Sequence, residues 1–179
     1  NKEEFDRLPA SAVAGKIVFF NYAFNQTFIN TGQAYGDAGI YRRFAASWAG
    51  KKGAKAVIIR SLSSAVDDVP HTGMMRYDQD DTVKIPAVAI GPKSADELEK
   101  ALKTQKIVAK LNSNCEMKGE RLTHSVIGEI TGNKDSNVIV VSGHLDSWDV
   151  GEGAHDDGAG IVQSIEVLRT LKKLGLKNN

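Results

Sequence analysis

The residues most able to do chemistry lie between Gly143 and Gly160, where two imidazoles and several carboxylates follow an apolar run. His144 and Asp146 stand two positions apart, and Asp156 follows ten residues later. Imidazole nitrogen and carboxylate oxygen are ligands that zinc and similar borderline metal ions accept in proteins. The spacing therefore predicts a metal site, and a metallohydrolase is the first hypothesis for the function.

Two predicted elements would bring these side chains together. The apolar run 138–141 is typical of a strand, and residues two apart share a face, so His144 and Asp146 should point the same way. The amphipathic run that follows predicts a helix over about 158–174, with Asp156 at its start, where the helix dipole favours an anion. One carboxylate can bridge two metal ions about 3.5–4 Å apart, an arrangement that hydrolyses amides and phosphates.

Each of these residues also has an ordinary structural explanation. An aspartate before a helix is a common N-cap, and a histidine after a strand is common in loops. Their combination on one strand, loop and helix favours a functional site over these alternatives. The remaining candidates favour structure: His71 is expected in a loop turn, His124 at the surface, and Cys115 as a small semi-buried side chain with no paired base.

The composition describes a globular chain of one ordinary domain or two small ones, with 179 residues, 41% hydrophobic and 25% charged. The formal net charge is +1 and the basic residues are scattered, which argues against nucleic acid and membrane surfaces as partners. No apolar stretch reaches the roughly 18 residues of a membrane span. The chain begins at Asn1 without a signal-peptide pattern, as it would after removal of a leader or in a trimmed sequence.

Upstream of the candidate site, strands and helices alternate, which indicates an α/β fold. Short apolar runs predict strands at 15–20, 56–59 and 85–91, and Pro86 favours an edge or entry position for the third. A long loop, 62–84, is expected before that third strand. Further strands are expected at 107–111 and 125–130.

Two helices are expected between these strands. Asp37 is predicted to cap the first, whose apolar side chains at Ile40, Phe44 and Trp48 recur every four residues. Ser94 and Glu97 form the pattern of a capping box and predict the start of the second.

The segment Gly-His-Leu-Asp-Ser-Trp-Asp-Val-Gly at 143–151, followed by Gly-Ala-His-Asp-Asp-Gly-Ala-Gly at 153–160, resembles the co-catalytic zinc exopeptidases of the aminopeptidase and glutamate carboxypeptidase family. The segments 53–57, 70–73 and 84–87 are similar to the protease-associated insert of that family. The resemblance implies a protease-associated domain at 1–106, with strands flanked by two helices. It implies at 107–179 the start of a mixed-sheet peptidase domain.

The resemblance also implies roles for individual residues. His144 would ligate one of two zinc ions, Asp156 would bridge both, and Asp146 would act in catalysis by orienting His144. The Asp156–Asp157 peptide bond is a candidate cis bond. His155 stands where the family varies and is expected to be a loop residue.

One departure from the family limits what this chain can do alone. The family's general base is a glutamate in a downstream Glu-Glu pair, and further ligands, including a histidine, follow it. Here no Glu-Glu pair occurs after Asp156 and no histidine after His155. The resemblance thus implies a fragment of a secreted or periplasmic di-zinc exopeptidase for short peptides, itself inactive.

Two alternatives from other classes stay open. The chain could be a protease-associated module that binds proteins or substrates without catalysis, or part of a metal-dependent hydrolase of non-peptide substrates. Self-association of the chain is expected from its uncovered apolar surface. The strand 138–141 is apolar on both faces and would have an unpaired edge, and the helix 158–174 could exchange between copies.

Overall fold

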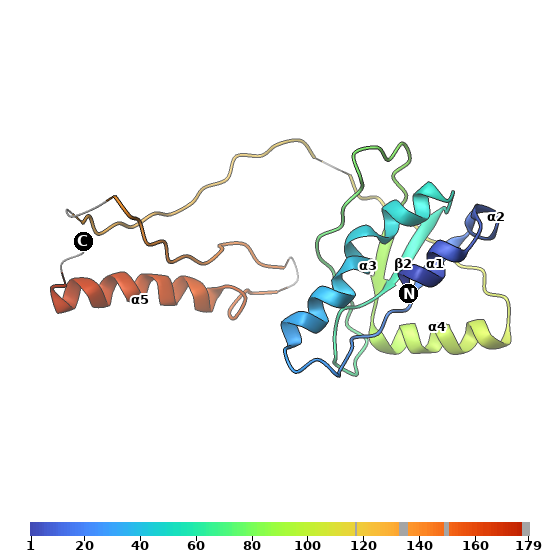
Figure 1. The fold of residues 1–179 in the computed structure, drawn as a ribbon, viewed down its shortest axis with the longest axis horizontal. Coiled ribbons are helices and arrows are strands. Elements are labelled where there is room, and N and C mark those ends of the chain that lie inside the picture. Colours follow the sequence, from blue (N-terminus) through green and yellow to red (C-terminus); the bar gives the residue numbers. More distant parts are fainter. Residues whose placement is uncertain (117, 133–135, 149–150, 177–179) are drawn as a thin grey trace. The chain divides into compact units, whose positions relative to one another are not determined.

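The computed structural model describes residues 1–116, 118–132, 136–148 and 151–176. The chain divides into two compact units, Asn1–Glu116 and Met117–Asn179 (Figure 1). Among the described residues, the first unit holds three strands and four helices, and the second holds the helix α5 (Gly158–Leu174). None of the described helices combines the length and apolar content that crossing a membrane requires.

The first unit is built on a parallel sheet of β1 (Ile17–Phe20), β2 (Ala56–Arg60) and β3 (Ala87–Ile90), in that order. Ile17 pairs with Ala56 and Val57 with Ala87. The predicted α/β class and all three of these strands are confirmed. The edge position that Pro86 favoured is also confirmed, since its carbonyl accepts from Val57 at 2.9 Å while its ring nitrogen has no hydrogen to donate.

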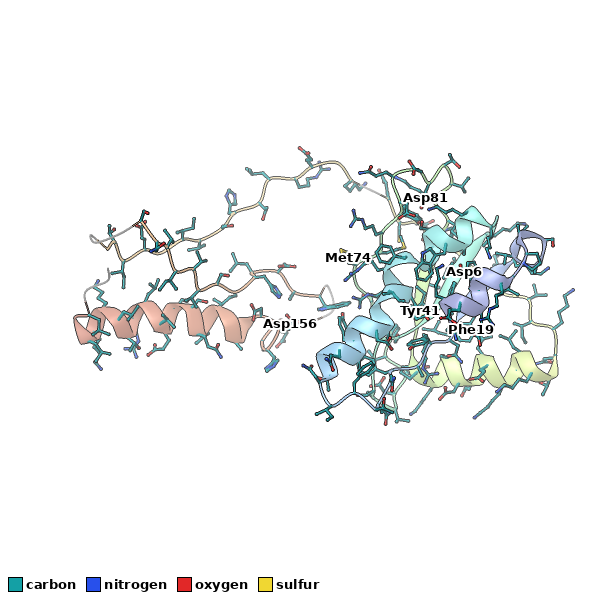
Figure 2. The ribbon with its side chains drawn as sticks, viewed as in Figure 1. Asp6, Phe19, Tyr41, Met74, Asp81 and Asp156 are labelled. Atoms are coloured by element: carbon teal, nitrogen blue, oxygen red, sulfur yellow. The ribbon has the colours of Figure 1, made fainter. Side chains whose placement is uncertain are left out.

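Helix α3 (Thr31–Lys51) crosses from β1 to β2 and packs against both strands. Its buried face is made mainly of small residues, namely Ala34, Ala38, Ala45, Ala46 and Ala49. Small side chains let the helix axis approach the sheet closely. Tyr41 of the same helix (Figure 2) is also buried, and its ring centroid lies 5.8 Å from that of Phe20 in β1. The core that results joins this helix to Phe20, Val57 and Ile59 of the strands.

The predicted start of α3 is wrong. Asn30, not Asp37, is its N-cap, and the Asn30 side chain accepts from the N–H of Gly32 at 2.8 Å. Because its first turns contain Gly32 and Gly36, the sequence reads as loop there. Burial of Ala34 and Ala38 against the sheet outweighs this weak local propensity.

The predicted capping box of α4 (Pro92–Thr104) is also wrong. Gly91 is the N-cap, and Ser94 bonds instead to Asp68 of the long loop, through its N–H at 2.9 Å and its hydroxyl at 2.8 Å. The contact requires glycine at position 91, since a Cβ there would lie 2.4–2.6 Å from Asp68. A carboxylate from a distant loop thus occupies the helix N-terminus.

The same long loop is held to the sheet near its beginning. Ser61, which is almost fully buried, donates its hydroxyl to the carbonyl of Ile90 and accepts from the N–H of His71, both at 2.8 Å. Further along, the Tyr77 hydroxyl donates to the carbonyl of Ile85. His71 therefore lies in an anchored loop, as its structural explanation predicts.

Two short N-terminal helices, α1 (Lys2–Arg7) and α2 (Ala10–Val13), were not expected. Helices of six and four residues are too short to give a periodic signal. They bury Phe5 and Val13 in the core, and the Lys52 ammonium donates to three carbonyls at the end of α1, those of Phe5, Asp6 and Leu8. Tertiary contacts supply the stability that these helices lack alone.

In the second unit, α5 has the predicted bounds, but its described residues contain neither of the strands expected at 125–130 and 138–141. The strand expected at 107–111, at the end of the first unit, is also absent. Ile139 is 91% exposed, and its neighbours Val138 and Val140 are nearly as open. A central strand needs a hydrogen-bonded neighbour on each side, and the described part of this unit offers only one helix. The expected mixed sheet is therefore wrong for the residues described, although the apolar pattern that suggested it is real.

We expect the Tyr22 phenol to titrate at an unusually high pH. Its hydroxyl donates to Asp37 at 2.7 Å, and this hydrogen bond to a carboxylate raises the pKa of Tyr22 to about 12. The folded pKa lies above the unfolded value, so the bond stabilises the fold below about pH 10 and is lost as the pH rises through 12. Tyrosinate absorbance should show a group that titrates near pH 12. Burial also raises the pKa of Tyr77, so Tyr22 is identified by its response to a change at Asp37.

Asp37→Asn should return this group toward an ordinary tyrosine pKa and flatten the alkaline loss of stability. Asp80→Asn, which makes the same charge change at an exposed position of the long loop, should leave the titration as it was. A tyrosinate titration in Asp37→Asn that is unchanged from the parent would contradict the assignment.

Candidate metal site

His144 is the centre of a cluster formed where the segment 143–148 meets the first turn of α5. Its Nδ1 lies 2.9 Å from the Asp146 carbonyl oxygen and 3.2 Å from an Asp146 carboxylate oxygen. Its Nε2 lies 2.9 Å from the Asp156 carboxylate, near the start of α5 in Figure 2. The structure therefore brings all three predicted site residues together.

Both ring nitrogens of His144 face oxygen atoms that can only accept. Because the Asp146 carbonyl cannot donate, Nδ1 must carry a hydrogen, and Nε2 is then the nitrogen free to bind a cation. Either a proton or a metal ion must stand between Nε2 and the Asp156 carboxylate. The carbonyl of Asp146 and the carboxylate of Asp156 accordingly raise the pKa of His144 above its usual value.

Asp157 positions this cluster, and sequence reasoning did not single it out. One oxygen of its carboxylate accepts from the N–H of Gly160 and caps α5, and the other accepts from the N–H of His144, both at 3.1 Å. The N-cap is thus Asp157, so capping, the alternative explanation for an aspartate before this helix, applies to Asp157 and not to Asp156. The signal was present, because an aspartate directly before Gly-Ala-Gly and an amphipathic run is a capping pattern.

The peptide bond between Asp156 and Asp157 is cis, as the resemblance implied. With Asp157 facing the helix, the Asp156 carboxylate is directed to the imidazole. The two neighbouring aspartates therefore have different roles: Asp157 accepts backbone N–H groups, and Asp156 contacts the imidazole ring.

Glycines let the backbone segments approach each other. A Cβ on Gly143 would lie 2.6 Å from the nitrogen of Ile161, and one on Gly160 would lie 2.3 Å from the Asp157 carboxylate. Gly153 adopts a left-handed φ of +67°, and its carbonyl accepts from the N–H of Gly158 at 2.8 Å. Gly143, Gly153 and Gly160 are thus required by the geometry of the site, because a side chain at any of them would clash or strain the backbone.

A cavity of about 220 Å³ opens beside the imidazole, with Asp146, Glu152 and Asp157 in its lining. The His144 side chain is 51% exposed, so a ligand from solvent can reach it. Three carboxylates around one imidazole favour a cation over an anion.

The donors fit a zinc ion in kind but not in number. An imidazole nitrogen and a carboxylate oxygen converge, and a second carboxylate stands behind the ring, as in many zinc sites. Within 1–116, 118–132, 136–148 and 151–176, however, no three His, Cys, Asp or Glu side chains are grouped to hold a metal. Cys115 is exposed, which corrects its expected semi-burial, and like His71 it belongs to the other unit.

We expect Asp157→Ala to loosen the whole cluster. The change removes the cap of α5, at a cost of about 1 kcal/mol, and also removes the acceptor for the His144 N–H. Amide exchange in the first turn of α5 should accelerate, and the His144 imidazole resonances should move toward those of an ordinary histidine.

Asp157→Asn keeps a capping oxygen and should preserve most of the exchange protection. Glu166→Ala, which removes an exposed carboxylate from the middle of α5, serves as the matched control and should leave His144 unchanged. Unaltered exchange and imidazole signals in Asp157→Ala would contradict the positioning role.

Comparison with known proteins finds relatives over nearly the whole chain. Residues 125–179 match the profile of peptidase family M28. Human carboxypeptidase Q is 41% identical over 177 residues, which is 97% of this chain and 36% of the human protein. Carboxypeptidase Q of Xenopus laevis is 40% identical over 165 residues, 91% of this chain and 33% of that protein.

Among solved structures, a peptidase M28 precursor from Shewanella amazonensis is similar, with a TM-score of 0.53 and 34% sequence identity. The alignment covers 58% of this chain and 23% of the Shewanella chain. The chain thus spans about a third of the length of the curated relatives it matches. The resemblance predicted from its motifs is confirmed.

Proposed function

Because the chain belongs to peptidase family M28, we propose that it carries part of the active site of a zinc-dependent exopeptidase acting on short peptides. The observation that carries this proposal is the convergence of His144 Nε2 and the Asp156 carboxylate, with Asp146 held behind the ring. In a protein of this family, that pair is where a hydrolytic metal centre would be built.

We propose that His144 and Asp156 are metal ligands, with Asp156 able to bridge two ions through its two oxygens. When bound, zinc would supply Lewis acidity and a water of lowered pKa. The chain's own residues provide the setting: Asp146 fixes the ring tautomer through Nδ1, and Asp157 holds the His144 backbone against α5. Asp146 is thus a positioning residue.

We further propose that 1–106 is a protease-associated domain and that 107–179 begins the peptidase domain. The parallel sheet with α3 and α4 supports the first assignment, and the position of the motif supports the second. The family resemblance also leads us to propose a secreted or periplasmic protein. The general base and the remaining ligands are not supplied by residues 158–179, so this chain alone should not hydrolyse peptides.

The test of the proposed function is zinc titration of the 15N-labelled 179-residue chain. Zinc should shift the His144 imidazole signals with a dissociation constant of micromolar order or weaker, since four-ligand sites gain about 10–16 kcal/mol and here two ligands act. Binding should strengthen as the pH rises, because the proton on His144 competes with the metal and its pKa is raised. No dipeptide should be hydrolysed.

His144→Ala and Asp156→Asn should each abolish the zinc shifts, and His124→Ala should retain them because His124 is exposed and outside the cluster. Zinc shifts at His124 with none at His144 would overturn the assignment of the site. A nanomolar constant lost in Asp156→Asn, or turnover lost in His144→Ala, would mean that the chain completes its site by another route.

We also propose that copies of the chain associate through the apolar segment 138–141. The exposure of Val138, Ile139 and Val140 supports this, because such a surface is rarely left open in water. Light scattering over a range of concentrations should detect dimers or larger species. Ile139→Lys should weaken the association, whereas Val108→Lys, an equally exposed change in the first unit, should not. A monomer at every concentration would contradict the proposal.

A further inference from the structure

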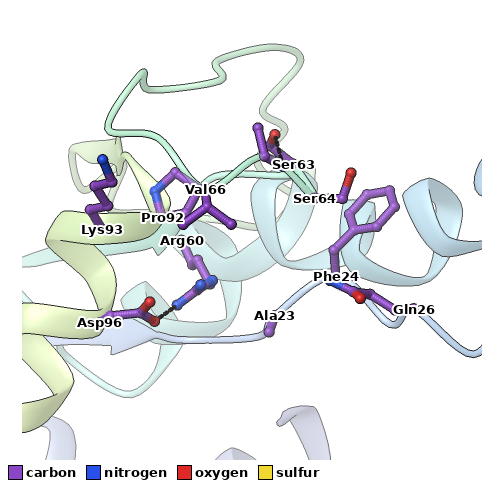
Figure 3. A pocket seen from close by; sticks show the side chains of 11 residues that line it. Ala23, Phe24, Gln26, Arg60, Ser63, Ser64, Val66, Pro92, Lys93 and Asp96 are labelled. Carbon is purple, nitrogen blue, oxygen red and sulfur yellow. Dashed lines mark hydrogen bonds and ion pairs between the residues drawn. The ribbon is translucent and has the colours of Figure 1, made fainter.

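A second cavity lies in the first unit, at the edge where the carboxyl ends of β1, β2 and β3 meet (Figure 3). Its volume is about 110 Å³, and segments that follow each of the three strands line it. In open parallel sheets this edge is where ligands usually bind. The metal-site residues belong to the other unit, so this cavity is a separate candidate.

The cavity has a positive charge at its base. Arg60, the last residue of β2, has a side chain only 13% exposed, and its Nη1 donates to Asn21 and to Asp96. Both of these bonds use Nη1, which leaves Nε and Nη2 with no acceptor among the described residues. Lys93 also lines the cavity and outweighs the charge of Asp96, so the ionised lining carries one net positive charge.

The neighbouring helix terminus is already filled. Asp68 accepts from the N–H and the hydroxyl of Ser94 in the first turn of α4, and this hydrogen bonding holds the pKa of Asp68 below its usual value. The protein thus places one of its own carboxylates at this edge of the sheet. The Lys93 ammonium and the Nε and Nη2 groups of Arg60 are left for a carboxylate that comes from outside.

The rest of the lining is apolar or weakly polar. Phe24 and Val66 face the cavity from two different loops, and Pro92 closes it beside α4 (Figure 3). The Ser63 hydroxyl lies among them and can bond to an amide group. The volume is a few times the roughly 30 Å³ of a water molecule, which suits one residue and excludes a long acyl chain.

We propose that this cavity binds the C-terminal residue of a short peptide, with the carboxylate on Arg60 and Lys93 and the side chain against Phe24 and Val66. The combination of a cationic base, an apolar wall and a residue-sized volume selects this ligand over inorganic anions and over neutral apolar molecules. The site is independent of the zinc ligands and would exist whether or not the protein is a peptidase.

The test is titration of the labelled 179-residue chain, without zinc, with N-acetyl-leucine and with N-acetyl-leucinamide. The acid should give saturable amide shifts at residues 23–26, 63–66 and 92–96, and the amide should give weak or no shifts. Lys93→Gln should raise the dissociation constant about two- to five-fold, as expected for one exposed charge. Lys103→Gln makes the same change ten residues along the helix, beyond the cavity, and should have no effect.

Arg60→Gln should weaken binding about ten-fold, because it removes the charged fork at the base. The amide spectrum of Arg60→Gln must match that of the parent, to show that the fold is intact. If it does not match, the test relies on Lys93→Gln, which breaks no hydrogen bond of the described residues. Equal shifts with acid and amide, equal saturation by inorganic phosphate, or no shifts in these segments would each overturn the proposal. None of these outcomes bears on zinc binding at His144, so the two proposals fail separately.

Discussion

The carboxylate of Asp157 is the interaction on which the second unit depends. It accepts two backbone N–H groups, one from the first turn of α5 and one from His144, and so joins a helix to a segment that has no strand partner among the described residues. Among the described residues neither donor has another acceptor, and without this one the helix end would be uncapped. The place of the imidazole follows from this single side chain.

The first unit also has an aspartate carboxylate bound at a helix N-terminus, that of α4. Asp68 reaches from the long loop to the first turn of α4 and receives both the N–H and the hydroxyl of Ser94. In each unit a glycine makes the contact sterically possible, Gly143 beside α5 and Gly91 beside α4. Carboxylates at helix N-termini thus set the backbone around both proposed ligand sites.

Acidic residues that are adjacent in the sequence therefore have different roles in the structure. Asp157 serves the backbone, which leaves Asp156 to face the imidazole, and the Asp146 carbonyl orients the other ring nitrogen. An acceptor on each side of one histidine raises its pKa and prepares its Nε2 for a cation. In the first unit Asp68 likewise occupies the helix terminus, and Asp96 binds only Nη1 of Arg60, so Lys93 and the other N–H groups of Arg60 remain available.

Local sequence pattern by itself determined the strands β1, β2 and β3, the bounds of α5, and the grouping of His144, Asp146 and Asp156. In each case the signal is short-range: an apolar run, a helical period, or a two-residue spacing on an extended segment. It did not determine the caps of α3 and α4, the existence of α1 and α2, or the exact role of each neighbouring aspartate. Only tertiary structure decided these, because chain reversal brings Ser94 to Asp68 and His144 to Asp157. Helix α3 begins at Asn30 because Ala34 and Ala38 are buried against the sheet. Residues 138–141 give the clearest contrast, since their apolar pattern specifies a strand whereas a strand forms only where another chain segment offers its hydrogen bonds.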